Sequence, residues 1–300
     1  MRESNPLLWY HLIGWTRHRY QQQRVLFYTI AFVIMLLYAT ALTIMLRSLP
    51  ETRTVVNFVL FLVCLLTPLF SYNLFSTEYE KATWEFLALT RLSAKQILLG
   101  KWLTGMVRLG ILFVGLLPFL LVIDSAKALD QIPTRLFLYQ ILLALLCVFS
   151  WGTLLITAGV WISFRWRSTV LSASLLYGLQ IFILLLLPFL AAIFNANSDR
   201  EGTLTVALQS DFRSFSERIL FWVMAFFNGQ FVVWFNPFYT LHELYWMMPH
   251  WRWDYSGNWE QTALAMRAVG WGWVQSLVYL LLSAGFWGLT YNGIRKHWRK

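Results

Sequence analysis

The sequence predicts an all-α membrane protein with six transmembrane helices. Of its 300 residues, 58% are apolar and only 13% are charged, whereas soluble domains carry about 25% charged residues. Six apolar runs are each long enough to cross the hydrocarbon core, which takes a helix of about 20 residues. The runs leave no room for a separate soluble domain, so we expect residues 1–300 to form a single transmembrane domain.

The predicted spans carry almost no charge, because a charged side chain in lipid is costly and backbone polar groups must be satisfied within each helix. Arg108 is the exception, and we expect its long side chain to reach the near membrane surface. Contact with a neighbouring helix or a substrate is the alternative. The six predicted spans are 25–46, 54–75, 102–123, 136–164, 168–198 and 268–294.

Lys and Arg predict how these spans thread the membrane, because both are enriched in cytoplasmic loops. With six crossings, more than half of the 24 Lys and Arg residues fall on one side. We place that side, and both termini, in the cytoplasm. The outer segment 199–267 holds more acidic than basic residues. The predicted cytoplasmic segments are 1–24, 76–101, 165–167 and 295–300.

A seventh apolar run, 219–241, is the uncertain element of this topology. Its middle reads Asn228-Gly229-Gln230 and its end reads Asn236-Pro237. A seventh crossing would place the basic C-terminus outside, against the charge bias. We therefore expect 219–241 to be re-entrant or to lie on the outer surface, with a seventh span as the alternative.

The first 24 residues predict an amphipathic helix in the inner membrane interface. They combine apolar Leu7, Trp9 and Trp15 with basic Arg17 and Arg19, a composition that favours the boundary between headgroups and acyl chains. A disordered basic tail is the alternative. The first apolar run is longer than the core of a signal peptide, about 7–15 residues, so we expect the first span to be retained.

The net charge of +10 does not indicate nucleic-acid binding. The basic residues form short clusters beside apolar spans, where they face anionic lipid headgroups. Cys64 and Cys147 lie inside apolar runs, so we expect neither a disulfide framework nor a metal site built on cysteine. Met247, Met248 and His250 are soft-metal ligand types, but Met more commonly fills packing gaps, and we expect no metal.

The inner segment 76–101 is longer than a connector between neighbouring helices needs to be. Its first half carries acidic residues early, which favours the N-terminal turn of a helix. Ser93 is suited to cap a second helix that continues into the third span. Leu87, Leu89 and Leu92 would then lie at a corner exposed to the cytosol, which indicates docking to a partner. Folding of these leucines back onto the membrane surface is the alternative.

This segment resembles the first cytoplasmic loop of ABC-2 class permeases of ABC transporters. The family pattern is E-x-E-x-G-T-x-E-x-L-x-x-T-P-L-S-x-x-x-I-x-x-G-K. The chain departs from it at Ala82, where Gly is usual, and at Arg91, where Pro is usual. Matching offsets are held by Glu78, Glu80, Thr83, Glu85, Leu87, Thr90, Leu92, Ser93, Ile97, Gly100 and Lys101, and Trp84 stands at a position that the pattern leaves open.

Three further stretches extend the resemblance along the chain. Residues 5–8 (Asn-Pro-Leu-Leu) resemble the start of many such permeases, although His11 stands where an acid is common. Residues 164–168 resemble their basic loop between the fourth and fifth spans. Residues 236–238 (Asn-Pro-Phe) resemble the outer element before their last span.

The resemblance implies a fold and a partner. The fold has an N-terminal interfacial elbow helix, a cytoplasmic coupling helix between spans two and three, and short outer helices between spans five and six. Two permeases, identical or different, pair in the inner membrane of a prokaryote, and each sits on an ABC ATPase subunit. The chain contains no G-x-x-x-x-G-K-[ST] motif, so ATP and Mg²⁺ would be bound by the partner ATPase and this chain is not itself an enzyme.

By the resemblance, the residues that couple the permease to the ATPase lie in the first inner loop. Glu85 and Arg91 are expected to make polar contacts there, and Trp84, Leu89 and Leu92 to act as apolar anchors. Attachment of Trp84 and the leucines to the bilayer surface alone is the competing interpretation. The full expected coupling set is Glu78, Glu80, Thr83, Trp84, Glu85, Leu89, Arg91, Leu92, Ser93 and Lys101.

Asn57, Asn73 and Gln180 are polar residues in spans two and five, which lie near the dimer interface in the family. We expect them to form hydrogen bonds between helices, with a place along the substrate path as the alternative. The function implied is export of a substrate that the sequence does not identify. A non-transporting ABC subunit that passes mechanical work to an outer partner through 195–267, and a channel or membrane enzyme unrelated to ABC proteins, are the alternatives.

Overall fold

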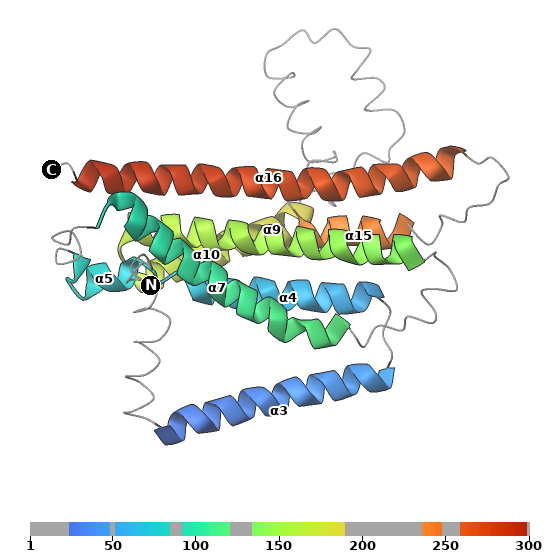
Figure 1. Cartoon of the computed structure of the whole chain (residues 1–300), viewed down its shortest axis with the longest axis horizontal. Helices are drawn as coiled ribbons and strands as arrows, with labels where there is room; N and C mark the ends of the chain where they lie inside the picture. Colours follow the sequence, from blue (N-terminus) through green and yellow to red (C-terminus); the bar gives the residue numbers. More distant parts are fainter. Residues whose placement is uncertain are drawn as a thin grey trace, which may run out of the picture.

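A computed structural model describes residues 24–48, 52–84, 92–120, 134–189, 236–247 and 259–298 (Figure 1). These residues form helices and turns, without strands. Six helices are long and apolar enough to cross a membrane, which confirms the predicted six apolar helices. Their bounds are α3 Arg24–Ser48, α4 Thr52–Ser71, α7 Ala94–Leu120, α9 Thr134–Trp166, α10 Thr169–Ile181 with the π-helical turn η2 Phe182–Leu186, and α16 Trp259–Trp298.

Two short helices lie at opposite ends of the bundle (Figure 1). Helix α5, Ser76–Glu80, follows α4 directly, and we call its side of the bundle the α5 end. Helix α15, Pro237–Met247, marks the other side, the α15 end. The predicted interfacial helix, 1–24, lies outside the described residues except for its last residue, and so does most of 219–241. The elbow helix and the re-entrant segment therefore stay predictions.

Helix α9 forms the centre of the bundle, between α16 and α4 (Figure 1). Small residues let its neighbours approach closely, as is common between transmembrane helices. A side chain at Gly159 would collide with Ser71 on α4, and one at Gly272 on α16 would press against Leu143 of α9. By contrast, most of the side chains described on α3 are exposed, so α3 lies at the edge of the bundle.

Proline interrupts helix α4 without ending it. Pro68 has no backbone N–H, so the carbonyl of Cys64, four residues earlier, loses its usual helical partner. Gln180 on α10 donates its side-chain Nε2–H to that Cys64 oxygen at 2.9 Å. Tyr177, one turn earlier on α10, donates its hydroxyl to the carbonyl of Leu65 at 2.8 Å. Helix α10 therefore supplies the hydrogen bond that proline removes, which is how membrane helices tolerate an interior proline.

A second proline is compensated in the same way. Pro188 follows η2 and leaves the carbonyl of Leu184 without its α-helical donor. Asn236, directly before α15, donates its side-chain Nδ2–H to Leu184 oxygen at 3.4 Å. Its Oδ1 accepts from the backbone N–H of Phe238 at 3.0 Å, which fixes the start of α15.

The third interior proline joins α3 to the bundle. Pro118 lies in α7, and the nearby carbonyl of Gly115 accepts a hydrogen bond from the Tyr38 hydroxyl of α3 at 2.7 Å. The Tyr38 ring also meets Phe119 edge-on, with ring centroids 5.1 Å apart. A polar side chain from a neighbouring element thus bonds a carbonyl three or four residues before each of these three prolines.

Candidate functional site

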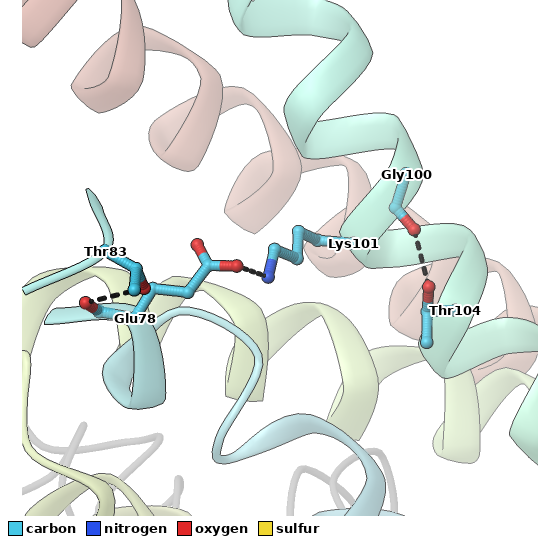
Figure 2. A network of polar contacts seen from close by, with 5 residues as sticks. All are labelled: Glu78, Thr83, Gly100, Lys101 and Thr104. Atoms are coloured by element: carbon cyan, nitrogen blue, oxygen red, sulfur yellow. Dashed lines mark hydrogen bonds and ion pairs between the residues drawn. The ribbon is translucent and has the colours of Figure 1, made fainter. Parts of the chain in front are cut away.

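The candidate site is the segment after α4, which the structure describes as residues 72–84. Its backbone turns twice, first between Ser71 and α5 and then after Glu80. Ser76 donates its hydroxyl to the Tyr72 carbonyl at 2.9 Å, which ties the start of α5 to the first turn. In the second turn, the Thr83 N–H and hydroxyl both donate to the Glu78 carbonyl, at 2.9 and 3.3 Å (Figure 2).

A buried ion pair fastens this segment to α7. The Glu78 carboxylate and the Lys101 ammonium point toward one another and form a hydrogen-bonded salt bridge (Figure 2). The Lys101 side chain has no exposed surface, and that of Glu78 is 14% exposed. The ammonium also lies 5.7 Å from the centre of the Phe75 ring. Because removing one member of such a pair leaves an uncompensated buried charge, each charge constrains the position of the other.

A second carboxylate fastens the segment to α10. Glu80 accepts hydrogen bonds from the backbone N–H of Thr169 at 2.7 Å and from its hydroxyl at 2.8 Å. Thr169 is the first residue of α10, where the N–H groups lack helical partners and a negative charge is favoured. Ser168 caps the same helix through a hydrogen bond from Leu171 N–H. Helix α5 thus presents one carboxylate to α7 and the other to α10.

Aromatic rings fill the space between the segment and α9. Phe75, Tyr79, Trp84 and Phe164 meet with ring centroids 5.0 to 6.3 Å apart. The Arg167 guanidinium lies 4.9 Å from the centre of the Tyr79 ring, within the range of a cation–π contact. Trp84 is half-buried in this cluster, so the segment is held by packing as well as by charge.

The start of α7 confirms one expectation and corrects another. Ser93 caps the helix as predicted, since its hydroxyl accepts from the N–H of Gln96 at 3.3 Å and Gln96 Oε1 accepts from Ser93 N–H at 2.8 Å. This reciprocal pair is a capping box. Leu92 is half-buried and packs against the core, so the expectation that it is exposed at the corner is wrong.

The expected site residues do not all come together. One connected assembly contains Glu78, Glu80, Thr83, Trp84 and Lys101. Leu92 and Ser93 lie just before α7, the helix that carries Lys101. Glu85, Leu89 and Arg91 lie outside the described residues, and their expected roles stay predictions.

The polar residues of the spans have separate surroundings. Gln180 bonds the Cys64 carbonyl, as described above, which is an interhelical contact of the expected kind. Asn57 is half-buried on α4, and its Oδ1 has no hydrogen-bond partner. Asn73 lies in the turn after α4, where its carbonyl accepts from Thr77 N–H. Arg108 donates to the Phe70 carbonyl at 3.4 Å, so it contacts the neighbouring helix α4.

Sequence reasoning missed the residues that receive the segment. Thr169 and Arg167 lie in or beside the basic stretch 164–168, which resembles a family loop, but nothing local indicated that this stretch meets Glu80 and Tyr79. Phe75 and Phe164 read as ordinary apolar residues at the ends of spans. Their roles depend on contacts between residues far apart in the chain.

Comparison of the chain with family models, curated proteins and solved structures gives no match. The six long apolar helices of the described residues fit a multi-pass helical membrane protein. Its candidate functional feature is the short segment after α4, which Glu78 and Glu80 hold to α7 and α10.

Proposed function

We propose that this chain is the membrane-spanning permease subunit of an ABC transporter, driven by ATP hydrolysis on a separate ATPase subunit. The observation that carries the proposal is the double attachment of α5. Glu78 binds Lys101 of α7, and Glu80 binds Thr169 of α10. A force applied to this segment would reach three spans at once, since the chain also joins the segment directly to α4.

The backbone at Ala82 supports the family resemblance. Ala82 has a φ of 52°, a left-handed conformation that glycine adopts at little cost and that strains other residues. It is the position at which the ABC-2 pattern carries Gly. A turn that requires left-handed backbone is therefore present where the family sequence would supply the residue suited to it.

The proposed mechanism is mechanical. ATP binding closes a pair of ATPase subunits, and their movement displaces the segment that contains α5 and the start of α7. Through this segment, ATP binding on the ATPase would shift the conformation of the transport pathway, and the conformation of the pathway would change the affinity for ATP. Glu85, Leu89 and Arg91 are the proposed contacts to the ATPase, whereas Trp84 and Leu92 support the segment from inside.

Two copies of the chain, or this chain and a different permease, would form the transport pathway in a prokaryotic inner membrane. Among the described residues, we propose Asn57 for a contact with a substrate or with the second permease, because its buried Oδ1 lacks a hydrogen-bond partner. Gln180 Oε1 also lacks a partner, but Gln180 Nε2 donates to the Cys64 carbonyl, so its proposed role is to join helices. ATP and Mg²⁺ belong to the ATPase.

The test is reconstitution of the chain with an ABC ATPase encoded beside it. We expect the two proteins to co-purify and Glu85→Ala to weaken the complex or its ATPase activity by at least tenfold, because a polar contact at the interface is lost. Lys95→Ala is the matched control on the exposed side of the first turn of α7, and it should retain coupling. A chain that binds no ATPase, or a Glu85→Ala variant with normal coupling, contradicts the proposal.

Flux separates the two ABC alternatives. A permease moves a substrate across proteoliposomes in an ATP-dependent way, and that substrate raises ATPase turnover. A non-transporting subunit would instead hold a stable outer partner and show no flux with lipids, peptides, drugs or glycans.

A further inference from the structure

The α5 end of the bundle carries a patch of exposed positive charge, which we call the basic patch. It draws on the loop after α5, the junction of α9 with α10, and the last turns of α16. All five side chains are exposed. Its members are Lys81, Arg165, Arg167, Arg295 and Lys296.

Packing brings these three stretches together. The ring of Phe164, next to Arg165, occupies the space in which a side chain at Gly293 would lie, so the end of α9 touches the end of α16. Arg167 lies over the ring of Tyr79, and Tyr79 is two residues before Lys81 in the chain. Figure 1 shows the last turns of α16 at the same end of the bundle as α5.

The residues that the structure describes do not neutralise this charge. Within the described ranges, no member of the basic patch forms an ion pair, and the salt bridge that the structure shows there joins Glu78 to Lys101. The nearby exposed carboxylate of Glu80 is engaged by Thr169. The patch therefore presents a net positive surface to an anion.

Apolar surface lies directly beside the positive charge. Trp166, 39% exposed, stands between Arg165 and Arg167, and its ring meets that of Trp161 edge-on at 5.6 Å. Val170 on α10 is 75% exposed and Leu289 on α16 is 56% exposed. The candidate spans of α9 and α16 end at Trp166 and Lys296, and that of α10 begins at Thr169. The patch thus lies where membrane spans reach the headgroup layer.

We propose that the basic patch binds the phosphate headgroup of an anionic phospholipid, whose acyl chains run along the exposed apolar side chains of α9, α10 and α16. Charge at the span ends selects an anion, and the adjoining Trp and aliphatic surface selects an amphiphile over a free ion. Interfacial Trp and basic residues are suited to this boundary. The proposal does not depend on the ABC assignment, since it concerns this chain alone.

The experiment uses the purified full-length chain in neutral detergent, titrated with phosphatidylglycerol, phosphatidylcholine or inorganic phosphate. Bound lipid is counted by native mass spectrometry, and thermal unfolding is followed in parallel. We expect saturable binding of phosphatidylglycerol, little of phosphatidylcholine and no stabilisation by inorganic phosphate. Each basic residue near an anionic headgroup contributes about 1 kcal/mol, so the double change Arg165→Gln with Arg295→Gln should weaken binding roughly thirtyfold.

Two controls make the result decisive. Arg47→Gln with Arg53→Gln removes the same charge from exposed residues at the end of α3 and the start of α4, and should leave the affinity unchanged. Arg165→Lys with Arg295→Lys keeps the charge and should keep most of the binding. Any of four outcomes would overturn the proposal. The first two are equal binding of phosphatidylcholine and equal stabilisation by inorganic phosphate. The others are an equal loss of binding in the Arg47/Arg53 variant and unchanged binding in the Arg165/Arg295 glutamine variant. The last outcome would show that the phospholipid binds elsewhere on the chain.

Discussion

The two ends of the bundle are held by different chemistry. At the α5 end, charged side chains bind α5 to α7 and α10 through Glu78 and Glu80. At the α15 end, neutral carboxamides bind backbone carbonyls: Asn236 donates to Leu184, and Gln140 donates to Leu244 at 3.2 Å. Loss of a partner therefore leaves a buried charge at one end and an unpaired carbonyl at the other, and the two losses differ in cost.

The largest effect is expected from Glu78→Gln. This change leaves the fully buried Lys101 ammonium without its carboxylate, which costs about 3–5 kcal/mol of unfolding free energy for a broken buried pair. Unfolding of the purified protein by denaturant in detergent measures the loss. The double variant Glu78→Gln with Lys101→Met removes both charges and should recover a large part of the stability. A double variant no more stable than the single one would show that the pair does not set the stability of this end.

The next effect concerns Asn236→Leu. The carbonyl of Leu184 then loses its side-chain donor, and a carbonyl left unsatisfied inside a folded protein costs about 1–3 kcal/mol. Pro188→Ala restores a backbone N–H at position 188, so Asn236→Leu should cost less in that background. A double-mutant cycle of thermal unfolding measures the coupling. Additive effects would contradict the account of Asn236 as the substitute for the hydrogen bond that Pro188 removes.

A gain in stability is expected from Ala82→Gly. Glycine relieves the strain of the left-handed backbone at this turn. Such a conformation costs a non-glycine residue about 1–3 kcal/mol, and we expect a stabilisation at the low end of that range, about 1 kcal/mol. Ala158→Gly, inside α9, is the matched control and should destabilise by about 1 kcal/mol, because glycine weakens a helix interior. If Ala82→Gly destabilises to the same extent, the turn does not need left-handed backbone.

The smallest effect is expected from Glu80→Gln. The amide oxygen still accepts from Thr169, but the negative charge at the start of α10 is lost. We expect an almost unchanged melting temperature and faster hydrogen exchange in the first turn of α10, which reports local opening. Lys81→Gln, at the neighbouring exposed position, should leave that exchange rate as it is. A large drop in melting temperature would mean that the α5 end depends on this exposed contact as much as on the buried one.

The sequence predicts the parts of this structure that depend on local pattern. Uncharged runs indicate the six long helices, and Ser93 indicates the capped start of α7. The attachments are different, because Glu78 meets Lys101, Glu80 meets Thr169 and Gln180 meets Cys64 only after the helices pack. Leu92 shows the limit most clearly, since its apolar side chain is compatible with a docking surface and with a core, and packing places it against the core.

The proline contacts have a consequence for how this chain can change over evolution. The acceptors at positions 64 and 184 are main-chain oxygens, so the residue types there are free to vary without loss of the hydrogen bond. The donor Gln180 is needed only while Pro68 is present, whereas Asn236 also fixes the start of α15 through Phe238. In related chains, substitution of Pro68 should therefore release residue 180 from selection, and positions 68 and 180 should covary more strongly than 188 and 236.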